Sequence, residues 1–537
     1  MGTFYKKKPP EPVEYLGKED SECYPMNYKK KGLCYIFNHE NFKGPELGFL
    51  NQRIGTDIDA HKLKNVFEKL DFVVDDTDVV EFKDYTYGEI VEKLQLVHKL
   101  DKSEYSFFVC CILSYGKEDY LCSCEDIYPV QNIYQLFLGD KCKAFAGKPK
   151  IFFIQACPFD VDVSSTESTD SGKPNAIVFR IPTRSDFLVV YSTIPGDLSW
   201  NLNSNQGSWF IDALCSTIKN HISEMDLLQL LIIVNEKLSE MHNSKGLPVE
   251  VSCVTSTLIR DIKLIDSGSG GSEIQRYELV SNGRLRKGKV LIFNHEVYEN
   301  NRRNRRNGTD NDVKCLKTLF PRSDFKLCSF KDKTKKFIFQ ELHKAAKSHK
   351  KYGCFICCIL THGNLGTLSA FDKDYEISEL LSCFHNKWSG KPKVFLLQAC
   401  RGKILDPGFE MTESLSMTDS SDSESSATDS DFEEIVSEVP VNFRHLSHPD
   451  FLLLSSAPPG CLSFRSTSGS WFVQELWKVF TSFSGQDKDF LQLFTETNRE
   501  VAKRVSKNKK IPSISDKKLT LCLTSTLTRN LDFRSLN

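Results

Sequence analysis

The apolar positions along this chain follow two alternating patterns. In one pattern, about four to eight apolar residues follow one another, as they do in strands that are buried on both faces. In the other, apolar residues recur with the spacing of an amphipathic helix. Buried strands that alternate with such helices predict an α/β sandwich, with a mostly parallel central sheet flanked by helices. The continuous runs lie within residues 288–296, 353–363 and 391–400, and the helical pattern lies within 314–320, 339–347 and 470–480.

The whole pattern occurs twice along the chain. The motif IFNHENF at 36–42 returns as IFNHEVY at 292–298, and GKPKIFFIQAC, which ends at Cys157, returns as GKPKVFLLQAC, which ends at Cys400. The separation between matching motifs changes from 256 to 243 to 269 residues, so the two copies differ by loop insertions around a shared core. Two further motifs recur in the same order, which are GSWF at 207–210 and 469–472, and TSTL at 255–258 and 524–527.

Composition divides the chain further. A Gly- and Ser-rich stretch at 267–272 separates the copies and has the composition of a flexible linker. In the second copy, residues 406–438 include eleven acidic residues and no Lys or Arg, and 160–174 is the shorter equivalent in the first copy. Such segments bury too little apolar surface to offset the entropy of ordering, so we expect disordered, protease-accessible loops. The expected organisation is an extension at 1–30, a first module at 31–265, a linker at 266–275 and a second module at 276–537, the last divided into a large part at 281–405, the acidic loop at 406–438 and a small part at 439–537.

Overall composition argues against several other classes of protein. The 537 residues are enough for more than one core, and a formal net charge of −1 gives no general attraction to nucleic acid or to an anionic membrane. The N-terminus has no apolar signal stretch and no run of about 18 apolar residues occurs, so we expect a cytoplasmic protein without a membrane partner. Cys354 and Cys357 have a CxxC spacing without a second pair. We therefore expect reduced core thiols, no metal and no cofactor.

Residues that could perform thiol chemistry lie at the ends of two predicted strands. A thiol protease needs a reactive Cys, a His that takes and returns its proton, and hydrogen-bond donors for the oxyanion. His362 closes the run at 353–363 and Cys400 closes the run at 391–400. Neighbouring parallel strands would bring both residues to the carboxyl edge of the sheet, where open α/β sheets place their sites. The backbone N–H groups of Gly363 and Cys400 are the candidate oxyanion donors.

These motifs resemble the caspase family of Asp-specific cysteine proteases. The segment Gln398-Ala-Cys-Arg-Gly402 fits the family signature QAC[RQG]G, and His362 lies 38 residues before Cys400. The resemblance covers nearly the whole of both copies. It implies two tandem caspase-like sandwiches and protein substrates that are cut after Asp.

The resemblance also implies a basic pocket for the substrate aspartate. In the family this pocket is formed by an Arg of an R-x-G-T-D segment, the Gln of QAC and an Arg shortly before GSWF, which correspond here to Arg306, Gln398 and Arg465. Ser463 and Phe464, beside Arg465, are further candidate substrate-binding residues. Two guanidinium groups on one carboxylate give charge-assisted hydrogen bonds that a neutral side chain does not match.

The first copy lacks part of this chemistry. It has Tyr115 where the second copy has His362, and a phenol is a poor base for a thiol at neutral pH. Pro158 follows Cys157, and Asn201 stands at the position of Arg465, although Arg53 and Gln155 are kept. We expect an inactive, pseudocaspase-like domain. By resemblance, it would pair with the second domain through the last strands, at 250–263 and 518–532, as a tethered activating partner.

Two other functions stay open at this point. A non-catalytic decoy or regulatory scaffold that binds other caspases is consistent with the altered first copy. The basic cluster from Arg302 to Arg306 could be a nucleic-acid patch, but it has no interleaved aromatic residues, so we expect no nucleic-acid partner. A caspase-like protein made as a zymogen, acting in apoptosis or a related pathway, would be cut after Asp. The candidate cleavage residues are Asp429, Asp419, Asp422, Asp170 and Asp266.

Overall fold

The computed structural model describes most of the chain. The described residues are 13–15, 20–44, 47–68, 77–117, 120–157, 179–181, 183–192, 207–245, 249, 251–264, 274–279, 286–321, 323–385, 387–413, 446, 448–482, 488–507 and 512–532. No helix within these ranges has both the length and the apolar character needed to cross a lipid bilayer.

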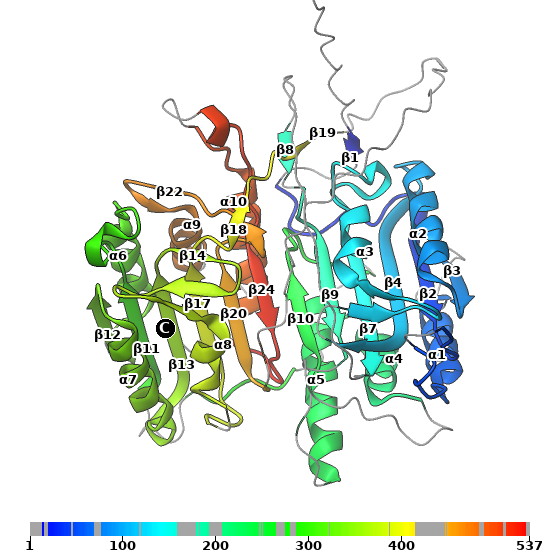
Figure 1. Cartoon of the computed structure of the whole chain (residues 1–537), viewed down its shortest axis with the longest axis horizontal. Coiled ribbons are helices and arrows are strands. Elements are labelled where there is room, and N and C mark those ends of the chain that lie inside the picture. Colours follow the sequence, from blue (N-terminus) through cyan, green and yellow to red (C-terminus); the bar gives the residue numbers. More distant parts are fainter. Residues whose placement is uncertain are drawn as a thin grey trace, which may run out of the picture.

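One large sheet runs through both halves of the molecule, with helices on its two faces (Figure 1). The first half contributes β2 (Lys30–Asn38), β3 (Thr77–Lys83), β4 (Tyr105–Lys117), β7 (Lys150–Cys157), β9 (Phe187–Tyr191) and β10 (Cys253–Ser256). The second half contributes β11 (Arg286–Asn294), β12 (Phe325–Lys331), β13 (Tyr352–Leu360), β17 (Lys393–Gln398), β20 (Phe451–Ser455) and β24 (Cys522–Ser525). The order across the sheet is β12-β11-β13-β17-β20-β24-β10-β9-β7-β4-β2-β3.

The pairing within each half confirms the predicted, mostly parallel sheet. β11, β12, β13, β17 and β20 pair in parallel with one another, and so do β2, β3, β4, β7 and β9. β24 pairs antiparallel with β20, and β10 pairs antiparallel with β9. They also pair antiparallel with each other, with Val254 opposite Ser525, and this pair joins the two halves at the centre of the sheet.

Helices cover both faces, as the periodicity predicted. They are α1 (Thr56–Glu68), α2 (Tyr87–Leu96), α3 (Val130–Leu136), α4 (Trp209–His221) and α5 (Leu227–Ser244) in the first half, and α6 (Thr309–Leu319), α7 (Lys335–Ala346), α8 (Ile377–Ser382), α9 (Trp471–Ser482) and α10 (Phe490–Lys503) in the second. Buried residues of α1, α4, α5, α6, α9 and α10 belong to one apolar core that extends through both halves. The residues under α2 and α3, and those under α7 and α8, form two separate cores on the opposite face.

Several short strands lie outside the main order of the large sheet. They are β5 (Tyr120–Cys122) with β6 (Ile127–Pro129), β14 (Gly363–Asn364) with β15 (Thr367–Ser369) and β16 (Asp374–Glu376), β18 (Gly402–Ile404) with β21 (Gly460–Cys461), and β22 (Arg465–Ser466) with β23 (Gly469–Ser470). A three-stranded sheet combines both halves, because β19 (Phe409–Glu413) lies between β1 (Val13–Tyr15) and β8 (Phe179–Ile181).

The structure differs from the sequence expectation at three places. The last strands are only four residues long, because the residues around them form other contacts, such as the bridge between Cys23 and Asp261. The first eight residues of the expected acidic loop are ordered, since Asp406 is 7% exposed and β19 follows it. Finally, the N-terminal extension is part of the fold, because Tyr24 is buried and its hydroxyl donates to Asp186. Local composition did not reveal these contacts because each joins distant parts of the chain.

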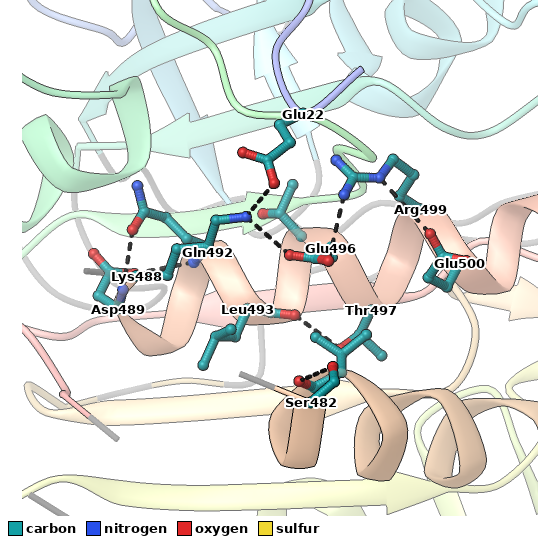
Figure 2. Close-up of polar contacts among 12 residues, drawn as sticks. Glu22, Ser482, Lys488, Asp489, Gln492, Leu493, Glu496, Thr497, Arg499 and Glu500 are labelled. Carbon is teal, nitrogen blue, oxygen red and sulfur yellow. Dashed lines mark hydrogen bonds and ion pairs between the residues drawn. The ribbon is translucent and has the colours of Figure 1, made fainter. Parts of the chain in front are cut away.

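Two helix caps meet at the boundary between the halves. Asp226 and Asp489 cap α5 and α10, and each is followed three residues later by a Gln that closes a capping box. The Gln229 amide also donates to Asp489 at 3.0 Å, and the Gln492 amide donates to Asp226 at 2.8 Å. Figure 2 shows Asp489 and Gln492 at the start of α10. The two carboxyl groups are therefore buried beside each other, in a reciprocal network across the boundary.

This carboxyl pair makes stability depend on pH. Burial, followed by the charge of Asp489, raises the pKa of Asp226 to about 7, above its value in an unfolded chain. The folded protein therefore keeps a proton that the unfolded chain releases. We expect the free energy of unfolding of the wild type, relative to Asp226→Asn, to fall as the pH rises from about 4 to about 7, by up to about 1.4 kcal/mol per pH unit. Urea unfolding across this range measures the difference.

A matched substitution separates this effect from a general loss of negative charge. Asp140→Asn removes the same charge from an exposed side chain that forms no ion pair among the described residues, and it should not reproduce the change that Asp226→Asn causes. Stability curves of Asp226→Asn and wild type that run parallel between pH 4 and 7 would contradict the expectation.

Candidate active site

The pairing of two neighbouring strands positions the candidate catalytic residues. β13 and β17 are parallel, and Leu360 is opposite Gln398 at the end of the pair. His362 and Cys400 each follow two residues later, so both leave the same edge of the sheet at the same level. The backbone N–H of Thr361 donates to the carbonyl of Gln398, which ties the two exits together. The expected meeting of both chain segments at the carboxyl edge therefore agrees with the geometry.

Gly363 lies against the backbone of the Cys400 segment. A Cβ atom at this position would lie 2.8 Å from the carbonyl oxygen of Cys400 and 3.1 Å from the Cβ of Ala399. The first distance is shorter than real Cβ contacts and the second is tighter than most of them, so a larger residue would push the two segments apart. Glycine is therefore needed for the close approach that brings the candidate oxyanion donors of Gly363 and Cys400 together.

The imidazole of His362 is held in one orientation. Its Nε2 lies 2.7 Å from the carbonyl oxygen of Asn304, and a carbonyl only accepts hydrogen bonds, so Nε2 carries the hydrogen. The lone pair is then on Nδ1. Burial, with the positive charges of Arg306 and Arg465, lowers the pKa of His362 to about 4. The ring is neutral at pH 7 and is able to accept a proton.

Tyr298 supports the backbone of His362. Its hydroxyl accepts a hydrogen bond from the backbone N–H of His362 at 3.1 Å, and it lies 2.9 Å from the hydroxyl of Thr361. Thr361 donates onward to the carbonyl of Ser369, so Tyr298 donates to Thr361. The centres of the Tyr298 and His362 rings are 5.3 Å apart. A chain of hydrogen bonds thus fixes the residue from which the imidazole extends.

Two arginines lie close to Cys400 and to each other. Arg306 is fully buried, and its Nη1 donates to the carbonyl of His295 and to the hydroxyl of Thr309. Burial and the charge of Arg465 lower the pKa of Arg306 to about 10. The pKa of Arg465 is also lowered by burial, and interactions with Asp312, Tyr298 and, to a smaller extent, Cys400 partly offset both shifts. Both guanidinium groups are therefore within electrostatic reach of the thiol.

Contacts between two loops hold the arginines together. A Cβ at Gly308 would lie 2.5 Å from the carbonyl oxygens of Ser466 and Thr467, and Gly308 has a left-handed backbone with φ of 83°. The segment after Arg306 therefore touches the hairpin that begins at Arg465. Asp312 of α6 accepts the backbone N–H of Ser470 at 2.8 Å and fixes the other strand of the same hairpin.

Several polar atoms in this region have no hydrogen-bond partner within the described part of the chain. They are Nε and Nη2 of Arg306 and Oε1 of Gln398, all of them buried. The amide nitrogen of Gln398 donates to the Ser463 hydroxyl at 3.0 Å, and the backbone N–H of Ser463 lies 3.4 Å from Sγ of Cys400. Unsatisfied buried donors are costly, and an acidic group bound here would satisfy those of Arg306. Phe464, the residue after Ser463, stacks on Trp471, with 4.9 Å between the ring centres.

The first half has the same strand framework, but different side chains occupy the positions of the site. Tyr115 is opposite Cys157 in the pairing of β4 with β7, as His362 and Cys400 correspond in the second half. The Tyr115 ring lies 5.1 Å from that of Phe42 and 6.0 Å from the Arg53 guanidinium. Tyr115 also packs against the small apolar cluster that contains Leu47. The Tyr115 ring thus lies over Arg53, the residue that matches Arg306. The position that matches Arg465 has Asn201 instead of an arginine.

Other candidate residues are placed as follows. The basic cluster is partly neutralised, because Arg302 and Arg303 share Asp374, and Arg305 shares Glu296 with Lys331. No cluster of three or more potential metal ligands was found in the described ranges. The positions that lie outside the described residues are Pro158, Asn201 and the five candidate cleavage residues, which are Asp170, Asp266, Asp419, Asp422 and Asp429.

Two residues of the site were missed by the sequence analysis. Asn304 contributes only its backbone carbonyl, which no residue type reveals. Tyr298 did leave a signal, because the repeat places Phe42 at the same position in the first copy, IFNHENF against IFNHEVY. The hydroxyl that distinguishes the two copies is the atom that contacts the backbone of His362.

Comparisons with known proteins agree with the repeated architecture. The family model of the caspase domain matches residues 31–262 and again residues 287–524. The chain is similar to caspase-3 of Xenopus laevis, with 38% identity over 239 residues that cover 44% of this chain and 82% of the relative. It is also similar to caspase drICE of Drosophila melanogaster, with 33% identity over 258 residues, or 45% of this chain and 72% of the relative. Among solved structures, caspase-1 from Spodoptera frugiperda matches at 31% identity with a TM-score of 0.40, over 49% of this chain and 100% of that one.

The hydroxyl of Tyr298 should influence the reactivity of Cys400. Tyr298→Phe leaves the His362 N–H without its acceptor, which costs roughly 1–3 kcal/mol if the group stays buried. We expect alkylation of Cys400 by iodoacetamide at pH 7 to slow by about fivefold, as the imidazole loses its orientation. Mass spectrometry of the Cys400 peptide measures the rate. Tyr375→Phe is the matched control, because the Tyr375 hydroxyl is buried and has no partner within the described residues. Equal rates in Tyr298→Phe and wild type would contradict the role of Tyr298.

Proposed function

The chain belongs to the caspase family of cysteine proteases, with a caspase domain in each half, and on this basis we propose that its second half is an endopeptidase that cuts proteins after Asp. The observation that carries the proposal is the electrostatic interaction of the buried Arg306 and the partly buried Arg465 with Cys400, whose strand leaves the sheet at the same level as that of His362. No other group of described residues combines a nucleophile, a base and an unsatisfied binding pocket in this way.

Each residue has a defined role in the proposed reaction. Nδ1 of His362 takes the proton from Cys400, and the thiolate attacks the carbonyl carbon of the scissile bond. The backbone N–H groups of Gly363 and Cys400 stabilise the negative oxygen that forms. His362 then returns the proton to the leaving amine. In the second step it accepts a proton from water, which hydrolyses the thioester on Cys400 and regenerates the thiol.

Specificity for Asp follows from the charge of the pocket. Arg306 and Arg465 repel each other, so a bound carboxylate relieves their repulsion as well as accepting their hydrogen bonds. An uncharged side chain of the same shape would leave two desolvated cations close together. The pocket therefore discriminates in two ways: it binds the Asp carboxylate, and it disfavours a neutral side chain that leaves the two cations unpaired.

Peptide hydrolysis tests the catalytic proposal. Cys400→Ala should lower kcat/KM for a fluorogenic peptide with Asp before the cut by at least about 10³-fold, because no other described thiol lies beside His362. For the wild type, replacing this Asp by Asn should lower kcat/KM by about 10²- to 10⁴-fold, since two charge-assisted interactions are lost. Equal rates for wild type and Cys400→Ala would favour the competing function, a non-catalytic scaffold that binds other caspases.

We also propose that the first half is an inactive partner that supports the active site of the second. Asp406, six residues after Cys400, accepts the backbone N–H groups of Thr183 and Arg184 from the first half, at 3.0 and 3.3 Å. β19, which follows, pairs with β8 of the first half. The segment that continues from the nucleophile is therefore supported on the far side by the other domain.

Processing is part of the same proposal. A zymogen would be cut in the segments between its large and small parts, where the candidate residues are Asp429, Asp419, Asp422 and Asp170, or in the linker at Asp266. Asp406 is excluded as a cleavage residue, because its carboxylate is buried and receives hydrogen bonds from the first half.

One glycine of the first half offers a test of the support. A Cβ at Gly139 would lie 2.2 Å from the ring of Phe409 in β19, so Gly139→Ala must displace this ring. We expect kcat/KM to fall by about tenfold although the substitution is in the other domain. Phe409→Leu should restore part of the loss in the double variant, because the smaller side chain leaves space.

Gly88→Ala in α2 is the matched control, because a Cβ at that position would touch nothing within 4 Å. Full activity in Gly139→Ala, with its fold intact by circular dichroism, would contradict the supporting role of the first half without affecting the assignment of Cys400.

A further inference from the structure

The two sides of the domain boundary are related by the internal repeat. Asp226 and Asn235 of α5 correspond to Asp489 and Asn498 of α10, since they make the same contacts. The Asn235 amide donates to the carbonyl of Leu527 across the boundary, and the Asn498 amide donates to that of Leu258. The boundary would therefore accept two identical domains as readily as two different ones, if these residues alone formed it.

The segments before the two domains correspond in the same way. Tyr24 and Tyr277 donate from their hydroxyls to Asp186 and Asp450, and the backbone N–H groups of Asp261 and Asn530 donate to the carbonyls of Glu22 and Gln275. Glu22 and Gln275 therefore occupy matching positions. Glu22 contacts Lys488 at the start of α10. Because Gln275 is the counterpart of Glu22, the surroundings of these two residues can be compared directly.

On one side the boundary is ionic, as Figure 2 shows. Lys488 donates to Glu22 at 2.6 Å and pairs with Glu496 at 3.0 Å, while its own side chain is only 14% exposed. Lys503 pairs with Asp20 at 2.5 Å. Arg499, whose side chain is 8% exposed, donates to the carbonyl of Ser21. α10 thus presents cations to an acidic segment of the first half.

On the other side several of the matching positions are apolar, although Asp20 is matched by Glu273 and Glu22 by Gln275. The positions of Lys488 and Glu496 are taken by Met225 and Ile233, and Ser21 is matched by Ile274. Met225 and Ile274 are buried in the core that extends through both halves, and Ile233 packs against it. The remaining cations of α10 correspond to acidic residues in α5, since Arg499 and Lys503 are replaced by Glu236 and Glu240.

Pairing of two like domains would mismatch these surfaces. Two second halves would bring Lys488 against Ile274 and Gln275, so the Lys488 cation would keep Glu496 of its own helix but lose Glu22. Two first halves would bring Asp20 and Glu22 against the acidic face of α5, where like charges repel. In the pairing within one chain, the cations of α10 meet the acidic segment at 20–22 on one side, and Met225, Ile233 and Ile274 share one apolar core on the other.

We propose that this contrast, an ionic contact of Lys488, Arg499 and Lys503 with Asp20–Glu22 on one side and an apolar contact on the other, selects the first half as the partner of the second and excludes pairs of like halves. This inference rests on one part of the proposed function, the role of the first half as supporting partner of the second, and adds how that partner is selected. Selection by mismatch is effective because a wrong pair loses an ion pair and gains a desolvated charge at once.

The test uses the whole chain, folded before it is cut. A site for an unrelated protease is introduced into the linker at 267–272, the folded chain is cut there, and the halves are left to exchange partners. The two halves differ in mass, so native mass spectrometry distinguishes pairs of unlike and like halves. Random pairing gives equal numbers of unlike and like pairs; in the wild type we expect the ratio of unlike to like pairs to exceed this value of one by at least about tenfold, and Glu22→Lys to remove most of the excess.

Two further variants make the outcome specific. Lys488→Met copies Met225 onto α10 and should increase pairs of two second halves. Glu125→Lys makes the same charge reversal in an exposed ion pair with Lys43 and should leave the distribution unchanged. Random pairing in the wild type, or unaltered selection in both Glu22→Lys and Lys488→Met, would overturn the proposal.

Peptide hydrolysis by the uncut chain keeps this result apart from the proposed function. Selective pairing without hydrolysis would contradict the endopeptidase and leave the selection intact. Hydrolysis with random pairing would contradict the selection alone.

Discussion

The parallel pairing of β13 with β17 is the constraint on which the candidate site depends. Backbone hydrogen bonds fix Leu360 opposite Gln398, and the two residues that follow on each strand bring His362 and Cys400 out at one level. A slip of one residue would turn every side chain of a strand to the other face and separate the pair. The chemistry of the site therefore depends first on strand register. Contacts from the loops then set the orientation of the side chains.

The same register in the first half shows that the framework alone does not make a site. Tyr115 and Cys157 face each other across β4 and β7, yet an aromatic ring covers Arg53 and joins a small apolar cluster. In the second half, Tyr298 uses a hydroxyl to hold the backbone of His362, whereas Phe42 at the matching position has none. Nε of Arg53 lacks a partner among the described residues, as Nε of Arg306 does, so the aromatic cover over the arginine, rather than the donors themselves, distinguishes the two halves.

Burial governs the electrostatics of both notable charge clusters. The two arginines near Cys400 are desolvated and repel each other, which prepares the pocket for an anion. The carboxyl pair of Asp226 and Asp489 is desolvated at the domain boundary, where amide donors from the two glutamines stabilise it. Like charges meet in both places, but only Asp226 and Asp489 are brought together by the repeat. Only the first cluster has donors without partners among the described residues, and this difference distinguishes a binding pocket from a structural contact.

The sequence by itself determined the elements that repeat locally: the buried strands, the amphipathic helices, the two copies, and the placement of His362 and Cys400 at strand ends. These follow from periodicities of two and 3.6 residues and from motifs that stay intact within a short stretch of chain. Tertiary structure decided the rest, including the carbonyl of Asn304 on the imidazole, the order of residues 406–413 and the contact of Glu22 with Lys488. Each of these joins segments that are distant in sequence, and some use only backbone atoms. Composition carries no record of such contacts, because they exist only once the chain has folded.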